Sequence, residues 1–228
     1  MIARHNPRPT HRPNRRTRRA GRSAFTLIET AMAVIIIGVG IVAMVDAQRA
    51  FMVSNAWSSQ AATASFLANE IREFTRKLPR HDLVTGLTLN GSTLVGWGPE
   101  NGEVSHLDYD DMDDFDGVIF GDGGEFDGPI NAFGEIIAAV DLGGDPMVDP
   151  TTGQLVPVAG WTQEVLVEKV HPFDLSNTIL PTATEAPSGS FAGRGVGDYP
   201  LRVTVIVRFQ GPTDAEAMEV TRMTWIVP

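Results

Sequence analysis

The sequence predicts an α+β fold in which a long N-terminal helix packs against a C-terminal antiparallel β-sheet. Three observations support this fold class. Residues 30–45 carry no formal charge, apolar residues then recur at helical spacing as far as Leu78, and short alternating apolar and polar runs follow Pro79. The chain therefore divides into a basic leader (1–24), a transmembrane half of the helix (25–46), an amphipathic half (47–78) and a β-rich head (79–228).

The N-terminal segments have the charge pattern of a single membrane span. Residues 1–24 contain eight arginines and no acid, which favours retention of this flank in the cytoplasm. The apolar run is longer than the roughly 7–15 residues of a secretory signal core. A plain signal anchor would account for the length and the basic flank, but it would not require Glu29. A carboxylate inside a membrane span is costly and therefore indicates a function.

The string Ala24-Phe25-Thr26-Leu27-Ile28-Glu29, behind the basic leader and ahead of the apolar helix, resembles the N-terminus of type IV pilins and of the pseudopilins of type II secretion. The resemblance implies that a prepilin peptidase cleaves between Ala24 and Phe25 and methylates the new amino group of Phe25. It also implies that Glu29 pairs with the N-terminal ammonium group of a neighbouring subunit, which offsets the cost of a buried carboxylate. Family members usually have glycine at the position of Ala24.

The same resemblance implies a structural role rather than an enzymatic one. We expect a single-pass protein of the bacterial inner membrane, with its head outside the cytoplasm, that joins other pilin or pseudopilin subunits in a cell-surface or periplasmic filament. Asp46 stands where many major pilins carry proline, which favours a minor pilus subunit. A minor pseudopilin of type II secretion is the alternative. An extracytoplasmic binding or enzyme domain on a signal anchor is the alternative from a different class.

Composition excludes several other classes of function. The formal net charge is −10, and subtracting the +8 of the leader leaves −18 for residues 25–228, which argues against a nucleic-acid partner. The chain has no cysteine, so disulfides, thiolate nucleophiles and cysteine zinc sites are excluded. The sequence shows no Gly-x-Ser-x-Gly elbow and no histidine pair at metal-binding helical spacing. We therefore predict no catalytic residues and no cofactor.

The predicted helix extends to the residue before Pro79, because proline disfavours helical backbone in the residue that precedes it. Its amphipathic half presents an apolar stripe to the head. The stripe consists of Phe51, Trp57, Ala61, Ala64, Leu67, Ile71, Phe74 and Leu78. Phe66 and Phe74 are the candidates for full burial, whereas Phe51 and Trp57 lie nearer the membrane exit, where contact with neighbouring subunits is the alternative. In the apolar half, Gly38 and Gly40 favour local melting or close helix packing, or reflect the frequency of glycine in membrane helices.

The head is predicted as one hairpin, three further strands and a long loop. The hairpin pairs 83–89 with 92–97 through an Asn90-Gly91 turn. The strands cover 163–170, 201–209 and 218–227, with the last two paired, and the loop covers 177–200.

An acidic segment (108–117) has six aspartates within nine residues, 108–116. Tyr109, Met112 and Phe115 recur every three residues, which predicts one apolar face on a helical turn and carboxylates directed to solvent. The segment resembles an Asp-Asp-x-Asp-Asp-x-x-Gly stretch of minor pilins of the mannose-sensitive haemagglutinin type and of pilus-modification proteins. Calcium is one interpretation, because Ca²⁺ binds carboxylate oxygens. The other is a solvated acidic loop, since 114–117 supplies only a fragment of an EF-hand loop.

Overall fold

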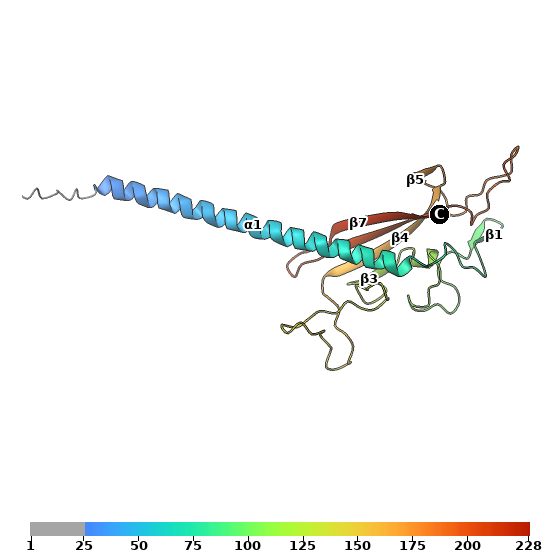
Figure 1. The fold of residues 1–228 in the computed structure, drawn as a ribbon, viewed down its shortest axis with the longest axis horizontal. Coiled ribbons are helices and arrows are strands. Elements are labelled where there is room, and N and C mark those ends of the chain that lie inside the picture. The colour runs from blue at the N-terminus through green and yellow to red at the C-terminus, as the bar shows by residue number, and fades with distance from the viewer. Residues whose placement is uncertain (1–25) are drawn as a thin grey trace, which may run out of the picture. The chain divides into compact units, whose positions relative to one another are not determined.

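A computed structural model describes residues 26–228 of the chain (Figure 1). The described residues divide into two compact units with the boundary between Met52 and Val53, and this boundary falls within the long helix α1 (Leu27–Thr75). The predicted α+β layout is confirmed, because the second part of α1 packs on a C-terminal antiparallel sheet. The leader and the predicted cleavage junction, Ala24 and Phe25, lie outside the described residues.

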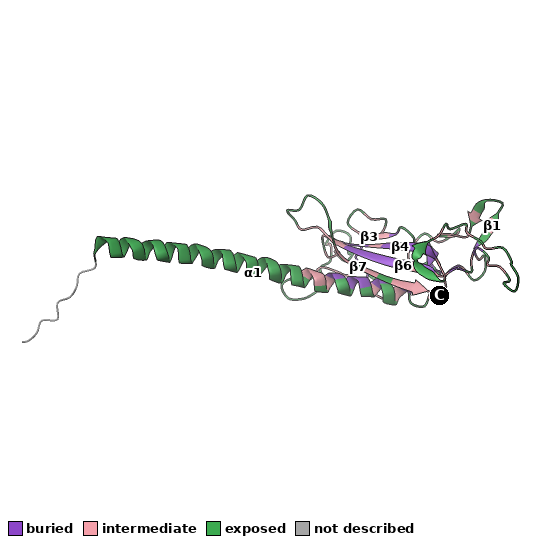
Figure 2. Ribbon diagram, turned by 90° about the horizontal axis from the view of Figure 1, so that it is seen from above, coloured by how far each residue is buried: buried purple, intermediate pink, exposed green. Residues whose placement is uncertain are grey.

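The first unit contributes the apolar part of α1, whose side chains are exposed throughout, as the green N-terminal half of the helix in Figure 2 shows. Thr26 caps the helix, because its Oγ1 accepts a hydrogen bond from the N–H of Glu29 at 3.4 Å. The helix continues unbroken through Gly38 and Gly40. Within residues 26–228, α1 is the one helix that is long and apolar enough to cross a membrane.

The second unit begins with the part of α1 that packs on the sheet. Ala64, Leu67, Ala68 and Ile71 are buried, at the spacing that places them on one face of a helix. They belong to the same core as the inward side chains of the strands. The helix ends at Thr75, three residues before the predicted end, and a turn leads into Pro79.

The buried stripe is shorter than the sequence predicted. Phe51 and Trp57 are exposed, so the first part of the expected stripe has no contact with the sheet. The expectation that Phe66 is buried was wrong, because it lies one residue before Leu67 and therefore about 100° round the helix from the buried face; its exposed fraction is 53%. Phe74 is half-buried against the core, in an edge-to-face contact with Phe115.

The main sheet is entirely antiparallel and has the order β3-β4-β6-β7. The strands are β3 (Ile119–Gly121), β4 (Trp161–His171), β6 (Leu201–Phe209) and β7 (Met218–Val227), and β5 (Asp174–Thr178) pairs with the end of β4. The bounds of β6 and β7 are those predicted from the sequence. The register places Val165 opposite Val205 and Val203 opposite Trp225, so the apolar residues of neighbouring strands lie side by side.

A second, two-stranded sheet is the predicted hairpin. It pairs β1 (Thr88–Asn90) with β2 (Thr93–Val95), and both strands are shorter than expected. The two-residue turn is Gly91-Ser92 rather than Asn90-Gly91, since Asn90 pairs with Thr93. Gly91 has a φ of 66°, which glycine adopts without strain at the first central position of a tight hairpin turn.

A buried side chain holds the helix, the sheet and a loop together. Gln163 of β4 is fully buried, and its Nε2 donates hydrogen bonds to the carbonyl oxygens of Leu67, at 2.8 Å, and Ile130, at 3.1 Å. Its Oε1 accepts the N–H of Ile130 at 2.8 Å. Both polar atoms of the Gln163 amide are therefore hydrogen-bonded, and burial of this side chain leaves no polar atom unpaired.

Candidate functional site

The first sequence-predicted site residue, Glu29, lies in the exposed first turn of α1. A negative charge there interacts favourably with the positive end of the helix dipole, and Thr26-x-x-Glu29 has the spacing of a capping box. Within residues 26–228, no ion pair reaches Glu29. Its carboxylate is therefore available to a group outside the described part of the chain or on another molecule.

The acidic segment lies at the end of α1, where it folds over the core. Its centre is a single 3₁₀ turn, Asp113–Phe115, and the N–H of Met112 donates to the carbonyl of Pro79 at 3.0 Å. Tyr109, Met112 and Phe115 are all buried, as their spacing predicted. The aromatic rings of Tyr109 and Phe115 meet edge to face, with ring centroids 5.2 Å apart.

The prediction that the carboxylates point to solvent was wrong for half of them. Asp111, Asp113 and Asp114 are each only 1% exposed, whereas Asp108, Asp110 and Asp116 are exposed. The three buried carboxylates have different partners. Those of Asp111 and Asp114 accept backbone N–H groups within the turn, whereas that of Asp113 contacts His81 and Gly98.

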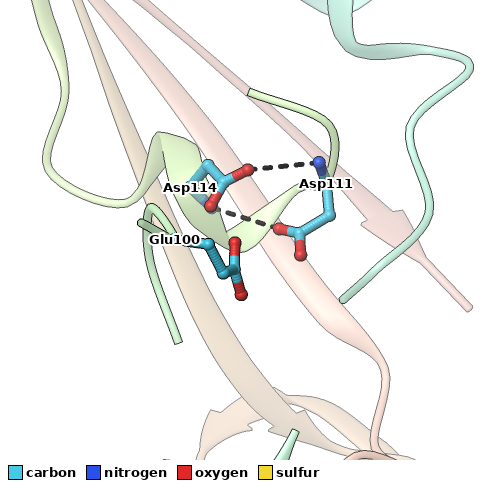
Figure 3. Close-up of side chains that lie close together, drawn as sticks. All are labelled: Glu100, Asp111 and Asp114. Atoms are coloured by element: carbon cyan, nitrogen blue, oxygen red, sulfur yellow. Dashed lines mark hydrogen bonds between the residues drawn. The ribbon is translucent and has the colours of Figure 1, made fainter. Parts of the chain in front are cut away.

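Asp111 and Asp114 cap each other's backbone in a reciprocal arrangement (Figure 3). Oδ1 of Asp111 accepts the N–H groups of Asp113 and Asp114, at 3.0 and 3.3 Å. Oδ2 of Asp114 accepts the N–H groups of Asp110 and Asp111, both at 3.2 Å. One oxygen of each carboxylate is thus committed to the turn. The other two oxygens, Oδ2 of Asp111 and Oδ1 of Asp114, are buried, and neither accepts a hydrogen bond within residues 26–228.

A third carboxylate completes the cluster. Glu100 approaches Asp111 and Asp114 from the loop that precedes the acidic segment, and its Oε2 is also buried without a hydrogen-bond partner among the described residues. One oxygen from each of these three side chains lies within 4.8 Å of the others. Asp114 also belongs to a second group of the same dimensions, with Glu103 and Asp110.

Burial raises the pKa of every acid at the centre of this cluster. Desolvation is the largest cause in each case, and neighbouring carboxylates add to it. The pKa of Asp111 rises to about 8, and those of Asp114 and Glu100 rise to about 7. These acids are costly to ionise together, because like charges at this separation repel each other in a poorly hydrated site.

The remaining buried aspartate has a different partner. Asp113 Oδ1 lies 3.0 Å from Nδ1 of His81, and burial raises the pKa of Asp113 to about 6 while it lowers that of His81 to about 4. At neutral pH His81 is therefore neutral and donates its Nδ1–H to the carboxylate, a hydrogen bond rather than an ion pair. Asp113 also accepts the N–H of Gly98 at 3.3 Å.

Sequence reasoning found the acidic segment but missed Glu100 and Glu103. Both lie in a turn in which the N–H of Glu100 donates to the Glu103 carboxylate at 2.8 Å. Two glutamates three residues apart in a loop resemble any solvated turn, so no sequence pattern marked them. Their position ahead of the acidic segment was the single signal available.

No protein-family model, curated protein or solved structure matches this chain.

Proposed function

We propose that this chain is a minor structural subunit of a type IV pilus-like filament. In this proposal a prepilin peptidase removes residues 1–24, Phe25 becomes the methylated N-terminus, and the subunit leaves the bacterial inner membrane to join other pilin-type subunits. The head is then extracytoplasmic, in a cell-surface or periplasmic filament. A minor pseudopilin of type II secretion has the same anatomy and is the nearest alternative.

The observation that carries the proposal is the unequal burial of α1. From Leu27 to Met52 the helix is mostly apolar yet exposed, while between Ala64 and Thr75 one face of the helix is buried in the head. An exposed apolar surface of this length requires either lipid or other protein chains. Glu29 places a carboxylate at the start of this apolar surface, where it can pair with the N-terminal ammonium group of a neighbouring subunit.

Mass spectrometry of the protein from its native cells tests the processing step. A mature chain that begins at N-methylated Phe25 supports the proposal. A chain that retains residues 1–24 overturns it and favours the signal-anchored domain.

Substitution of Glu29 tests assembly. Glu29→Gln keeps the side-chain length and polarity but removes the charge, so we expect normal membrane insertion and leader removal with at least tenfold less protein in sheared filaments. Immunoblots of membrane and filament fractions measure both. Thr30→Ala is the matched control, because Thr30 lies in the same turn and its hydroxyl donates only to the carbonyl of Leu27, at 2.9 Å. Wild-type incorporation of Glu29→Gln would reduce Glu29 to a helix-capping residue.

A further inference from the structure

Of the four buried side-chain oxygens that have no hydrogen-bond partner within residues 26–228, three belong to one cluster, and the fourth, Oε2 of Glu164, forms an ion pair with Arg208. Oε2 of Glu100, Oδ2 of Asp111 and Oδ1 of Asp114 are buried and unpaired within residues 26–228, and they come from side chains that Figure 3 shows pointing toward one another. Acceptors buried in this way normally face a donor or a cation, because an unsatisfied buried polar atom destabilises the fold.

We propose that Glu100, Asp111 and Asp114 form a Ca²⁺ site, with Glu103 and Asp110 at its outer edge. The dimensions fit the ion. Ca²⁺ binds oxygens at 2.3–2.6 Å, so two ligands of one ion are separated by at most about 5 Å. The three ligand atoms lie within 4.8 Å of one another.

The charges in the cluster favour a bound cation, rather than a basic side chain of the protein, as the partner of these carboxylates. Five carboxylates gather here, and within residues 26–228 none of them forms an ion pair with Lys, Arg or His. A divalent ion neutralises the repulsion between these closely spaced carboxylates.

The ligand set selects Ca²⁺ among common divalent ions. All the candidate ligands are carboxylate oxygens, which suit hard cations and are poor partners for copper or for structural zinc. Asp111 and Asp114 are fixed by the reciprocal caps of the turn, Asp110 directly precedes them, and Glu100 and Glu103 come from a separate loop. Such an irregular set meets the flexible coordination of Ca²⁺ more readily than the octahedral geometry of Mg²⁺.

A bound ion would add a direct link between two segments of the head. Glu100 and Glu103 belong to one loop, and Asp111 and Asp114 belong to the turn that is hydrogen-bonded to Pro79 at the end of α1. The ion therefore fixes the loop against the end of the helix. The site does not depend on the filament role, because every residue in it lies in the head.

Calorimetric titration tests the proposal on the full chain in detergent. After chelator treatment at pH 7.5, CaCl₂ should bind with a stoichiometry of one and release protons, seen as heats that depend on the ionisation enthalpy of the buffer. MgCl₂ should bind at least tenfold more weakly. The melting temperature should rise by about 5–10 °C when Ca²⁺ is present at a hundred times its dissociation constant.

Paired variants assign any binding to the cluster. Asp111→Asn and Asp114→Asn keep an oxygen that accepts the same backbone N–H groups, so both should fold, as circular dichroism would show, and both should weaken Ca²⁺ binding at least tenfold. Asp108→Asn is the control, because Asp108 is exposed, lies in the same segment and belongs to neither group of ligands.

Three results would overturn the site. One is the absence of heat and of any melting shift at 10 mM CaCl₂, which would mean that protons alone neutralise the acids. Another is an equal loss of binding in Asp108→Asn and Asp111→Asn, which would show diffuse attraction to an acidic surface. The third is binding of Mg²⁺ as strong as that of Ca²⁺.

Discussion

At the scale of single residues, the least expected feature is that aspartates occupy the core side of a turn. The sequence predicted which apolar residues face inward, because Tyr109, Met112 and Phe115 share one helical face. It did not predict that Asp111 and Asp114 would do so as well. Apolar spacing reports where hydrophobic side chains go, but carboxylates that cap backbone N–H groups follow the local path of the chain.

These buried acids make the stability of the head depend on pH. The pKa of Asp111 is raised to about 8 and those of Asp114 and Glu100 to about 7, against about 4 in an unfolded chain. Between pH 6.5 and 8 the folded state therefore binds more protons than the unfolded state, and the free energy of unfolding falls as pH rises. In chelator we expect a lower melting temperature at pH 8 than at pH 6.5.

Neighbouring groups do not reverse this trend within that window. Glu103 and Asp110 add negative charge beside the cluster, and Arg80 and Lys169 act on His81 and Asp113. The pKa of His81 is lowered to about 4 and that of Lys169 to about 8, so both oppose the trend, His81 mainly below about pH 6.5 and Lys169 from about pH 8 upward. Asp111→Asn should weaken the dependence of the melting temperature on pH. If the melting temperature of the unsubstituted protein rises from pH 6.5 to 8, the prediction is wrong.

Phe115 is the residue whose truncation should cost most in this region. It is fully buried and meets Phe74 and Tyr109 edge to face, at centroid distances of 5.8 and 5.2 Å. Phe115→Ala should lower the free energy of unfolding by about 3–5 kcal/mol. Phe66→Ala, on the exposed face of α1, should change it by about 0.5 kcal/mol or less. Urea unfolding compares the two, and similar values would contradict the assigned core.

At the scale of elements, the sequence predicted the strands that alternate and missed the segments that do not. β6 and β7 were identified with the observed bounds because their apolar residues repeat over nine or ten positions. The chain from 122 to 160 forms only isolated bridges, such as Ala138 with Pro157, and so lacks a run long enough to show a period. The end of α1 was placed three residues late, since Pro79 limits a helix without fixing its last turn.

The packed part of α1 should be necessary for the head to fold. It covers the apolar face of β4 and β6 with Leu67, Ile71 and neighbouring small residues. A variant that begins at Val53 should be soluble and unfold cooperatively. One that begins at Pro79 should aggregate, because it leaves this face bare. Size-exclusion chromatography and thermal unfolding compare them, and equal solubility would show that the helix contributes no core.

At the scale of the whole molecule, charge and apolar surface are segregated along the sequence. Residues 1–24 contain eight of the eighteen lysine and arginine side chains, and residues 30–45 contain no charged side chain. The acids gather in the remainder, which gives residues 25–228 a formal charge of −18 by subtracting +8 from −10. This segregation was readable from the sequence because it is compositional, whereas the cation site required Glu100 to be brought to Asp111 by folding.

The polar contacts of Gln163 also have a mechanical consequence. Its amide links the carbonyl of Leu67 in α1 to β4, which pairs with β6 from Trp161 to Lys169. Glu70 adds a second link, since its carboxylate accepts the N–H of Ala132 at 2.7 Å. Tension applied along the helix therefore loads several transverse hydrogen bonds at once and passes into the middle of the sheet. Helix and head should therefore resist separation by shear, because the load is shared by the central strands.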